Sequence, residues 1–456
     1  MPRVENGRAS MQVSWVRLAA VVAVLARCVA FVPPAAAQTG QTAQFPLQFD
    51  FLNPGARSLA LGSAFTAVAD DATAAFTNPA GLTFLVKPEV SAEIRYRRLD
   101  TPFLSGGRVS GTVTNIGQDT VQGPVYFSSL DATTRPYFLS FVYPMRRWAV
   151  AVYRHELVRQ INDFATNGAF QQVIFAGIPI NNARQLGLTG SRSIKVDTYG
   201  GSVAYRATDN VSAGVGVTVY RFEAASSFAS FGHGANIFGP VDLNDRGSTT
   251  TQVGSATKAA LNAGLLWTAH PKVRVGVVFR QGTSFAFSQV SVVPFEPTTS
   301  RTGDFRTPNV FGAGFRVQAN EQLSLAVDYD RVMYSRLKQD YIAFQVAPAA
   351  VDRVGLADAN EVHGGLEYVF TSVAHTPSLR AGIWYDPNHG VQYTSDFTNS
   401  PDDVLLKAIF PGSENLVHYC VGVGLPVSPQ FEINVGADLT GQRKYASASL
   451  VARFGK

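Results

Sequence analysis

The chain has 456 residues, of which 46% are hydrophobic and only 16% are charged. A typical soluble domain carries about 25% charged residues, so this composition disfavours an ordinary cytosolic enzyme. The 40 glycines and the 11% aromatic content favour strands and tight turns over long helices. The formal net charge is +5, and because residues 1–37 hold four arginines against one glutamate, +2 remains for the rest of the chain. With no basic run in that part, we expect no nucleic-acid partner.

Residues 1–37 have the pattern of a secretory signal peptide. Three arginines precede an apolar run from Leu18 to Ala26, and three alanines stand directly before Gln38. We expect this segment to be removed, although a signal anchor is an alternative and translation can begin at Met1 or at Met11. Cys28 lies in it, so the mature chain keeps only Cys420. Disulfides and cysteine-ligated metals are therefore excluded.

After this segment, no stretch approaches the roughly 18 consecutive apolar residues of a transmembrane helix. From Glu89 onward, fourteen runs alternate between apolar and polar residues, and each ends at Pro, Gly, Asn or Asp. The predicted strand cores are 89–97, 136–143, 148–156, 193–207, 211–223, 250–269, 273–281, 309–317, 322–335, 361–370, 378–386, 415–424, 430–439 and 443–454. Long and short connections alternate along nearly the whole series. Short turns on one side and long loops on the other are typical of an outer-membrane barrel, whereas a soluble double sandwich has no reason to alternate them.

Tyrosines and tryptophans lie near the predicted strand ends, as in the aromatic girdles of membrane barrels. These residues are Tyr137, Tyr143, Trp148, Trp267, Tyr334, Tyr368, Tyr385 and Tyr445. The predicted fold class is therefore all-β: a 14-stranded antiparallel transmembrane β-barrel in residues 88–456.

Residues 38–87 lack strand alternation and are rich in small residues, which favours short helices. Asn78 followed by Pro79 predicts a helix cap and a first helical position. A compact segment that precedes a barrel is expected to fill the lumen as a hatch. Asp70 and Asp71 have two interpretations: carboxylates that cap a helix, or a pair that binds a cation.

Three motifs, Gly55-Ala-Arg-Ser58, Ala69-Asp-Asp-Ala72 and Asn78-Pro-Ala-Gly-Leu82, resemble the FadL/TodX family of outer-membrane long-chain fatty acid transporters. The motifs match the family along the hatch, whereas the barrel resembles the family in its number of strands. It implies a fourteen-stranded barrel, a hatch motif at Asn78, Pro79 and Ala80, and hydrophobic cargo that leaves sideways through the wall. The chain departs from the usual terminal aromatic by ending in Phe454-Gly455-Lys456. Because a similar hatch opening occurs in PorV-like secretion proteins, a role in protein secretion, with a protein partner, is the alternative.

The expected function is passive uptake of a hydrophobic small molecule, a long-chain fatty acid or an aromatic hydrocarbon, across a bacterial outer membrane whose lipid surrounds the barrel. Two predicted loops are unusually apolar, and apolar surface clusters often mark binding sites. The candidate ligand-binding residues from these loops are Phe170, Phe175, Phe228 and Phe231.

Charged residues collect on the predicted lumen faces, with nearly balanced signs. They are interpreted either as ion pairs that hold the hatch to the wall or as arginines that receive a substrate carboxylate. The candidate arginines are Arg95, Arg280, Arg316 and Arg380.

An exit through the wall needs an interruption of strand pairing. Gly200 and Gly201, where a bulge is expected, and the stretch from Ala149 to Tyr153 are the candidates.

The seven histidines are scattered without metal-ligand spacing, and no nucleophile elbow or phosphate-binding loop occurs. We expect no cofactor, no metal and no enzymatic activity. An outer-membrane lipid hydrolase is the enzymatic alternative, and it would require a serine, a histidine and an acid together at the barrel wall.

Overall fold

The computed structural model describes residues 51–115, 119–175, 178–232, 242, 244–338, 352–396, 398, 400–441 and 443–455. The predicted signal peptide, residues 38–50 of the predicted hatch, and the side chain of Phe175 lie outside this description.

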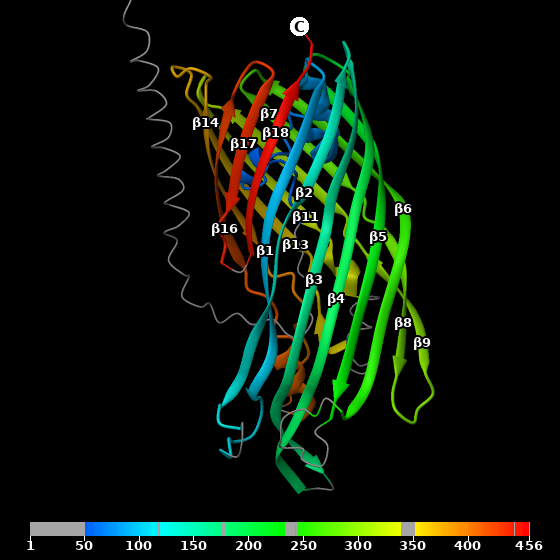
Figure 1. The fold of residues 1–456 in the computed structure, drawn as a ribbon. Helices are drawn as coiled ribbons and strands as arrows, with labels where there is room; N and C mark the ends of the chain where they lie inside the picture. The colour runs from blue at the N-terminus through cyan, green and yellow to red at the C-terminus, as the bar shows by residue number, and fades with distance from the viewer. Residues whose placement is uncertain are drawn as a thin grey trace, which may run out of the picture. The chain divides into compact units, whose positions relative to one another are not determined.

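Fourteen antiparallel strands form one closed sheet (Figure 1). They are β1 (Glu89–Arg108), β2 (Gly123–Pro144), β3 (Trp148–Phe175), β4 (Ile178–Arg206), β5 (Val211–Phe231), β6 (Arg246–His270), β7 (Val273–Arg280), β10 (Val310–Gln318), β11 (Leu323–Val332), β13 (Ala359–Val369), β14 (Ser378–Asp386), β16 (Leu416–Pro426), β17 (Phe431–Asp438) and β18 (Arg443–Arg453). Each pairs with the next in this order, and β1 pairs with β18 to close the ring. The predicted strand count and fold class are confirmed.

The first six strands are much longer than the others. β1 to β6 run for 20 to 29 residues, whereas the remaining barrel strands have 8 to 11. A transmembrane strand needs only about 9–11 residues, so the long strands continue past the membrane. The segments 98–135 and 157–192, expected as loops, are therefore largely strand. Phe170 lies on β3, and Phe228 and Phe231 lie on β5, so their assignment to loops is wrong.

Two further strands, β8 (Ser284–Val292) and β9 (Thr299–Arg306), form a hairpin that pairs with the outer part of β6. The alternation did not indicate this hairpin. Smaller elements complete the loops: η2 (Tyr334–Leu337), β12 (Val354–Gly355), β15 (Gln392–Tyr393) and α5 (Pro401–Ile409).

The barrel wall is apolar outside and polar inside. On β11, Val327 is 54% exposed while the neighbouring Asp328 is 1% exposed. On β17, Ile433 and Val435 are exposed in the same way, and Asp438 is buried. Apolar residues outside and polar residues inside are typical of a barrel wall that faces lipid. A soluble sandwich has the opposite distribution.

Aromatic residues mark the end of the barrel that carries the short turns. Tyr143, Trp148 and Trp267 are about half exposed there, as expected for an interfacial girdle. Tyr334 and Tyr445 are buried inside the molecule, so their assignment to a girdle is wrong.

The hatch consists of α2 (Ala56–Ala60), α3 (Ala74–Thr77) and η1 (Pro79–Phe84). Figure 1 shows these helices, drawn in blue, enclosed by the strands. Nearly every described hatch residue up to Thr83 is buried. Among the described residues, no helix is long and apolar enough to cross a membrane.

Glycines in the wall allow the hatch to approach closely. A Cβ on Gly214 would lie 2.4 Å from backbone atoms of Pro79 and Ala80, and one on Gly264 would lie 2.0 Å from Asn78 Oδ1. Small residues on both surfaces therefore permit backbone-to-backbone packing between the hatch and the strands.

Candidate functional site

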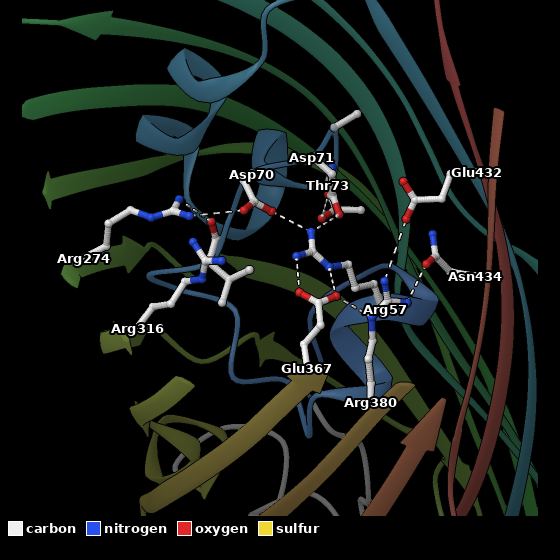
Figure 2. A network of polar contacts seen from close by, with 12 residues as sticks. Arg57, Asp70, Asp71, Thr73, Arg274, Arg316, Glu367, Arg380, Glu432 and Asn434 are labelled. Carbon is white, nitrogen blue, oxygen red and sulfur yellow. Dashed lines mark hydrogen bonds and ion pairs between the residues drawn. The ribbon is translucent and has the colours of Figure 1, made fainter. Parts of the chain in front are cut away.

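Arg57 of the hatch is the centre of a network of ion pairs that reaches the wall (Figure 2). Its Nη1 lies 2.6 Å from Asp70 Oδ1, and its Nη2 lies 2.8 Å from Glu367 Oε2 on β13. Glu367 also accepts a hydrogen bond of 2.7 Å from Arg380 Nε on β14. Asp70 in turn pairs with Arg274 on β7 at 3.3 Å. The network thus links the hatch to the neighbouring strands β13 and β14 and to β7, which is separated from β13 by β10 and β11.

Three wall carboxylates bind the hatch backbone directly. Glu93 accepts from the Gly55 N–H at 2.7 Å, and Glu89 accepts from the Ala72 N–H at 2.7 Å. Asp328 Oδ2 accepts from the N–H groups of both Phe65 and Thr66, at 2.7 and 2.6 Å. Such charge-assisted bonds are stronger than neutral ones, so they fix the hatch at three points of the barrel.

Asn78 both caps η1 and contacts the wall. Its Oδ1 accepts from the Ala80 N–H at 3.2 Å, and Pro79 occupies the first turn, as the cap prediction requires. Its Nδ2 donates to Thr66 O at 2.9 Å within the hatch and to Leu265 O of β6 at 3.4 Å. The Asn78-Pro79-Ala80 motif therefore joins the local turn to the strand behind it.

Asp70 and Asp71 have different surroundings. Asp71 Oδ1 accepts from the N–H and the hydroxyl of Thr73, the residue before α3, and no side chain caps α3 itself, so the capping interpretation is wrong for this helix. Asp70 is an ion-pair residue between Arg57 and Arg274. In the described part of the chain, no group of three or more His, Cys, Asp or Glu side chains is arranged to hold a metal ion.

The four candidate arginines lie at separate points of the lumen. Arg380 directs its guanidinium to Glu367, to Asn434 and toward Glu432. Arg316 lies opposite Arg274 in the ladder of β10 and β7 and donates to Gln318 at 2.7 Å.

The other two arginines contact both the hatch and an aromatic ring. Arg95 pairs with Glu93, donates to Asn53 O, and lies 3.8 Å from the ring centroid of Tyr137. Arg280 donates to Asn53 Oδ1 at 3.1 Å and lies 5.3 Å from the ring centroid of Phe76.

The candidate phenylalanines occupy two different environments. Phe170 is buried, with the Arg184 guanidinium 4.4 Å from its ring centroid. Phe228 packs against Phe164 with 6.4 Å between ring centroids, and Phe231 lies 6.0 Å from Arg246.

Sequence reasoning missed a larger aromatic group in this part of the barrel. Phe222 on β5 stacks on Phe285 and Phe305 of the β8–β9 hairpin, with centroid distances of 4.9 and 5.2 Å. These rings belong to one buried apolar cluster that continues to Phe76 of the hatch. The signal for the hairpin was weak because the alternation is irregular: Ala286 and Val292 are the exposed positions of β8, and β9 is polar over most of its length.

The wall is split between β2 and β3. Their ladder runs only from the pair Pro144–Ala149 to the pair Phe138–His155. Beyond it, β2 stays with β1 and β3 stays with β4.

Register shifts mark both sides of the split. The shift on β2 leaves out Tyr137, and the shift on β3 leaves out Leu157. Bulges of this kind bend a strand out of its ladder.

A pocket lies at the split. Its lining combines leucines with charged residues: Leu52, Arg95, Arg97, Leu99, Thr133, Arg135, Tyr137, Glu156, Leu157, Val158, Arg159 and Tyr445. Arg135 Nε lies 3.2 Å from Glu156 Oε2 across it. Backbone N–H groups of Ile161 and Asp163 bond to side chains of β2, to Asp131 and Ser129, in place of a regular ladder. Side chains of β2 therefore satisfy some of the backbone N–H groups of β3 that have no partner strand at the split.

Gly200 and Gly201 lie in an unbroken ladder. Both pair with β3 and with β5, and no register shift occurs there, so the expected bulge is wrong. Gly200 instead gives room to the Tyr153 ring, which lies 2.2 Å from where its Cβ would be. Apolar residues of β4 lie on both faces of this unbroken strand: Ile194 and Val196 point into the barrel, and Tyr199 is exposed on the outside. The stretch from Ala149 to Tyr153 is also continuously paired and ends just before the split.

Three histidines that are scattered in the sequence come together inside the wall. His418 Nδ1 lies 2.9 Å from Asp438 Oδ2, and His389 Nδ1 lies 3.0 Å from Asp386 Oδ1. His363 Nδ1 lies 2.7 Å from Gly62 O of the hatch. Of the three, His363 contacts the hatch directly, whereas His418 and His389 pair with carboxylates of the barrel wall.

A closed fourteen-stranded barrel with a lipid-facing wall and an N-terminal hatch defines an outer-membrane channel protein. Residues 36–397 match the model of the family described as outer membrane protein transport protein (OMPP1/FadL/TodX). The chain belongs to this family, whose members are outer-membrane transporters of hydrophobic compounds and not enzymes.

Solved structures share the fold at low sequence identity. A Pseudomonas aeruginosa FadL homologue has a TM-score of 0.60 at 15% identity, with 89% of this chain and 100% of that chain covered. The Ralstonia pickettii toluene transporter TbuX has a TM-score of 0.55 at 16% identity, with 90% of this chain and 100% of that chain covered. The P. putida toluene transporter TodX has a TM-score of 0.53 at 12% identity, with 89% of this chain and 100% of that chain covered. None of the curated protein sequences compared with the chain matches it significantly.

Proposed function

We propose that this protein mediates passive uptake of hydrophobic small molecules, which pass the hatch and leave through the wall between β2 and β3. The single observation that carries this proposal is the split itself. It places a pocket at an interruption of the ladder, next to the hatch residue Leu52. The resemblance to transporters of toluene and to a FadL homologue supports hydrophobic cargo.

A sideways exit is physically favourable for such cargo. A molecule that moves from the lumen into the acyl layer keeps its apolar area out of water, which is worth roughly 25 cal/mol per Å². Exit along the barrel axis would expose that area to solvent. Leu99, Leu157 and Val158 give the split an apolar surface for this transfer.

Gating by the hatch follows from how completely the hatch fills the lumen. Its helices are buried and are bound at several points by wall carboxylates and arginines. Passage of cargo therefore requires a local shift of the hatch, and α3 with Phe76 is the part that lies beside β3.

The first experiment measures uptake into proteoliposomes of a labelled long-chain fatty acid and of labelled toluene. We expect at least one to enter faster than into empty liposomes. If neither does, uptake fails as the function, and co-purification of a protein cargo would support the secretion alternative.

The exit is tested by closing the split. In the double variant Arg135→Cys with Glu156→Cys, a short thiol cross-linker joins two side chains that face each other across the opening. We expect uptake to fall toward that of empty liposomes and to recover after cleavage of the linker. Native Cys420 is buried and does not interfere.

The matched control joins Lys195→Cys to Glu223→Cys, which are direct partners in the closed ladder of β4 and β5. The same linker there should leave uptake unchanged. Normal uptake in the cross-linked Arg135/Glu156 variant would contradict an exit at this position.

A further inference from the structure

Arg159 on β3 and Lys195 on β4 lie side by side on the outer surface of the wall. They are direct partners in the β3–β4 ladder, and the next pair of that ladder, Gln160 and Ile194, is buried. Because successive residues of a strand point to opposite faces, Arg159 and Lys195 point outward. Like charges directly opposite each other destabilise a sheet, so an anion bound between these two cations would be stabilising.

Both cations lie just beyond the membrane-spanning part of the wall. Each is eleven residues from the short-turn end of its strand, which is Trp148 on β3 and Arg206 on β4. At ~3.3 Å per residue and a tilt of about 40°, eleven residues rise about 28 Å, whereas the apolar band of an outer-membrane barrel is about 25 Å tall. The pair therefore lies at the level of the lipid headgroups of the outer leaflet.

The carboxylates next to this pair already have arginine partners. Glu156 pairs with Arg135 at 3.2 Å, Asp131 with Arg97 at 2.8 Å, Glu223 with Arg221 at 2.8 Å, and Asp197 with Arg154. Burial and the neighbouring charge of Arg135 lower the pKa of Arg159, and Glu156 and Asp131 offset this effect only in part. Arg159 Nε is buried and has no hydrogen-bond partner among the described residues. The two cations therefore keep the capacity to bind an anion from outside the chain.

A shallow groove crosses the outer wall between the pair and the short turns. It has a volume of about 360 Å³, and Val203, Val215, Val217 and Leu261 line it beside Gly201. Gly201 is six residues from Lys195, or about 15 Å along the membrane normal at the same tilt. This distance is half of the ~30 Å hydrocarbon core, which is the depth of one leaflet. The groove therefore offers an apolar surface to the acyl chain of a lipid whose headgroup lies at the cations.

We propose that Arg159 and Lys195 bind the phosphate of a membrane lipid, and that one acyl chain of this lipid lies in the groove beside Gly201. A guanidinium group matches the oxygens of a phosphate, and a lysine binds phosphate as a point charge. This site is on the lipid side of the wall, so the inference does not rest on the proposed uptake function. Because Arg159 also lines the pocket at the split, the bound lipid lies beside the proposed exit.

The test measures the binding of three probes to the purified protein in a non-ionic detergent. They are dipalmitoyl phosphatidic acid, the corresponding diacylglycerol without the phosphate, and inorganic phosphate without the chains. We expect phosphatidic acid to bind most tightly. In the double variant Arg159→Gln with Lys195→Gln, its dissociation constant should rise about 25-fold, or about fivefold for each cation, while that of diacylglycerol stays unchanged.

The groove is tested separately with Gly201→Leu. A Cβ at Gly201 meets nothing closer than Ala151 O at 3.8 Å, so the new side chain fills the groove without displacing the strand. Both lipids should bind more weakly to this variant, and the binding of inorganic phosphate should not change. Unchanged binding of both lipids would contradict the place assigned to the acyl chain.

Arg331→Gln is the matched control, because Arg331 is an exposed arginine of β11 whose guanidinium is bound by Asp358 and Asn360. It should leave the binding of phosphatidic acid unchanged. If the double variant does not assemble, as judged by heat-modifiable migration, Lys195→Gln alone takes its place, with a fivefold effect.

Equal binding of phosphatidic acid and diacylglycerol to the unmodified protein, or an unchanged dissociation constant in the double variant, overturns the inference. Displacement of phosphatidic acid by an equimolar amount of inorganic phosphate or of oleate also overturns it, because the cations would then serve a free anion or the cargo. Uptake into proteoliposomes is measured independently of these probes, so the proposed function stands or fails separately.

Discussion

Arg57 shows at the residue scale how the hatch is held. Burial alone would lower the pKa of this guanidinium, but the carboxylates of Asp70 and Glu367 outweigh burial and raise the pKa, so the side chain stays charged. A buried charge of this kind is stabilising only while its partners remain. The hatch therefore depends on a small number of polar contacts that cannot be removed singly without cost.

We expect Arg57→Ala to loosen the hatch while the barrel stays closed. Removing one partner of a buried ion pair costs about 3–5 kcal/mol, because Glu367 and Asp70 lose their counter-charge. Hydrogen exchange of residues 51–85 should become faster, with heat-modifiable migration retained. Arg98→Ala, which removes the more exposed pair with Asp100, is the control and should cost about 1 kcal/mol or less. Equal exchange in both variants would contradict the central role of Arg57.

The loop after β1 is held by the buried pair of Arg108 and Asp119, with 2.7 Å between Nη2 and Oδ2. Burial would raise the pKa of Asp119, but hydrogen bonds from Arg108 and Thr114 outweigh burial and lower the pKa to about 2. A carboxyl whose pKa is lowered by folding contributes stability above its ordinary pKa of 3.8, and that contribution is lost as the pH falls toward 2.

We therefore expect this loop to be cut by pepsin increasingly as the pH falls from about 4 toward 2. Asp119→Asn, which removes the charge at all pH values, should make the loop sensitive to a neutral protease at pH 7. Cleavage sites read by mass spectrometry would identify the loop. Resistance of the Asp119→Asn loop at pH 7 would show that the ion pair does not anchor it.

At the scale of elements, the hatch and the strands fit because glycines stand where they meet. β5 and β6 present Gly214 and Gly264 to the Asn78-Pro79-Ala80 motif. The same strands present Val215 and Leu265 to the outside, where both are exposed. Because successive side chains of a strand point to opposite faces, one face of each strand contacts the hatch and the other face lies against the lipid.

We expect Gly264→Ala to displace the hatch motif, because its new Cβ would lie 2.0 Å from Asn78 Oδ1. The capping bond to Ala80 and the bond to Leu265 O would weaken, at a cost of about 1–2 kcal/mol. The measurement is ion leakage across planar bilayers, which should increase. Gly201→Ala is the control, since its Cβ meets nothing closer than Ala151 O at 3.8 Å. Equal leakage in the two variants would count against close packing at Gly264.

For the whole molecule, the barrel closes through its own ladders. Every barrel strand pairs with its two neighbours along at least part of its length, and β1 pairs with β18 over eleven residues, from Glu89–Arg453 to Leu99–Arg443. The hatch contributes no strand to this ring. Barrel formation and lumen closure are therefore separable.

We expect deletion of residues 51–85 to leave a folded barrel with an open lumen. Planar bilayers containing it should show steady ion conductance that the full chain lacks. The buried wall carboxylates lose their partners in the hatch, so the thermal midpoint of unfolding should fall. A deletion variant that does not insert would show instead that the hatch is needed for folding, and a closed one would contradict its role as the plug.

The sequence by itself determined the fourteen barrel strands and the cap at Asn78. Both depend on local rules: one face of each strand lies against lipid, so alternation is sharp, as at Phe431, Ile433 and Val435, and a cap needs only neighbouring residues. Beyond the membrane this constraint ends, and β3 after Leu157 carries polar residues on both faces. The lengths of β1 to β6 and the β8–β9 hairpin were missed for that reason.

Only the tertiary structure decided where the wall opens and which lumen groups meet. Gly200 and Gly201 were reasonable candidates for an opening, because glycine often marks a bulge. A ladder is formed by two strands, however, and the sequence of neither strand alone indicates where their pairing ends. The partners of Arg57, and the contact of His155 with Phe76, likewise join residues far apart in the chain. Such contacts form only once the barrel has closed around the hatch, which is why the sequence indicated the charges of the lumen but not their arrangement.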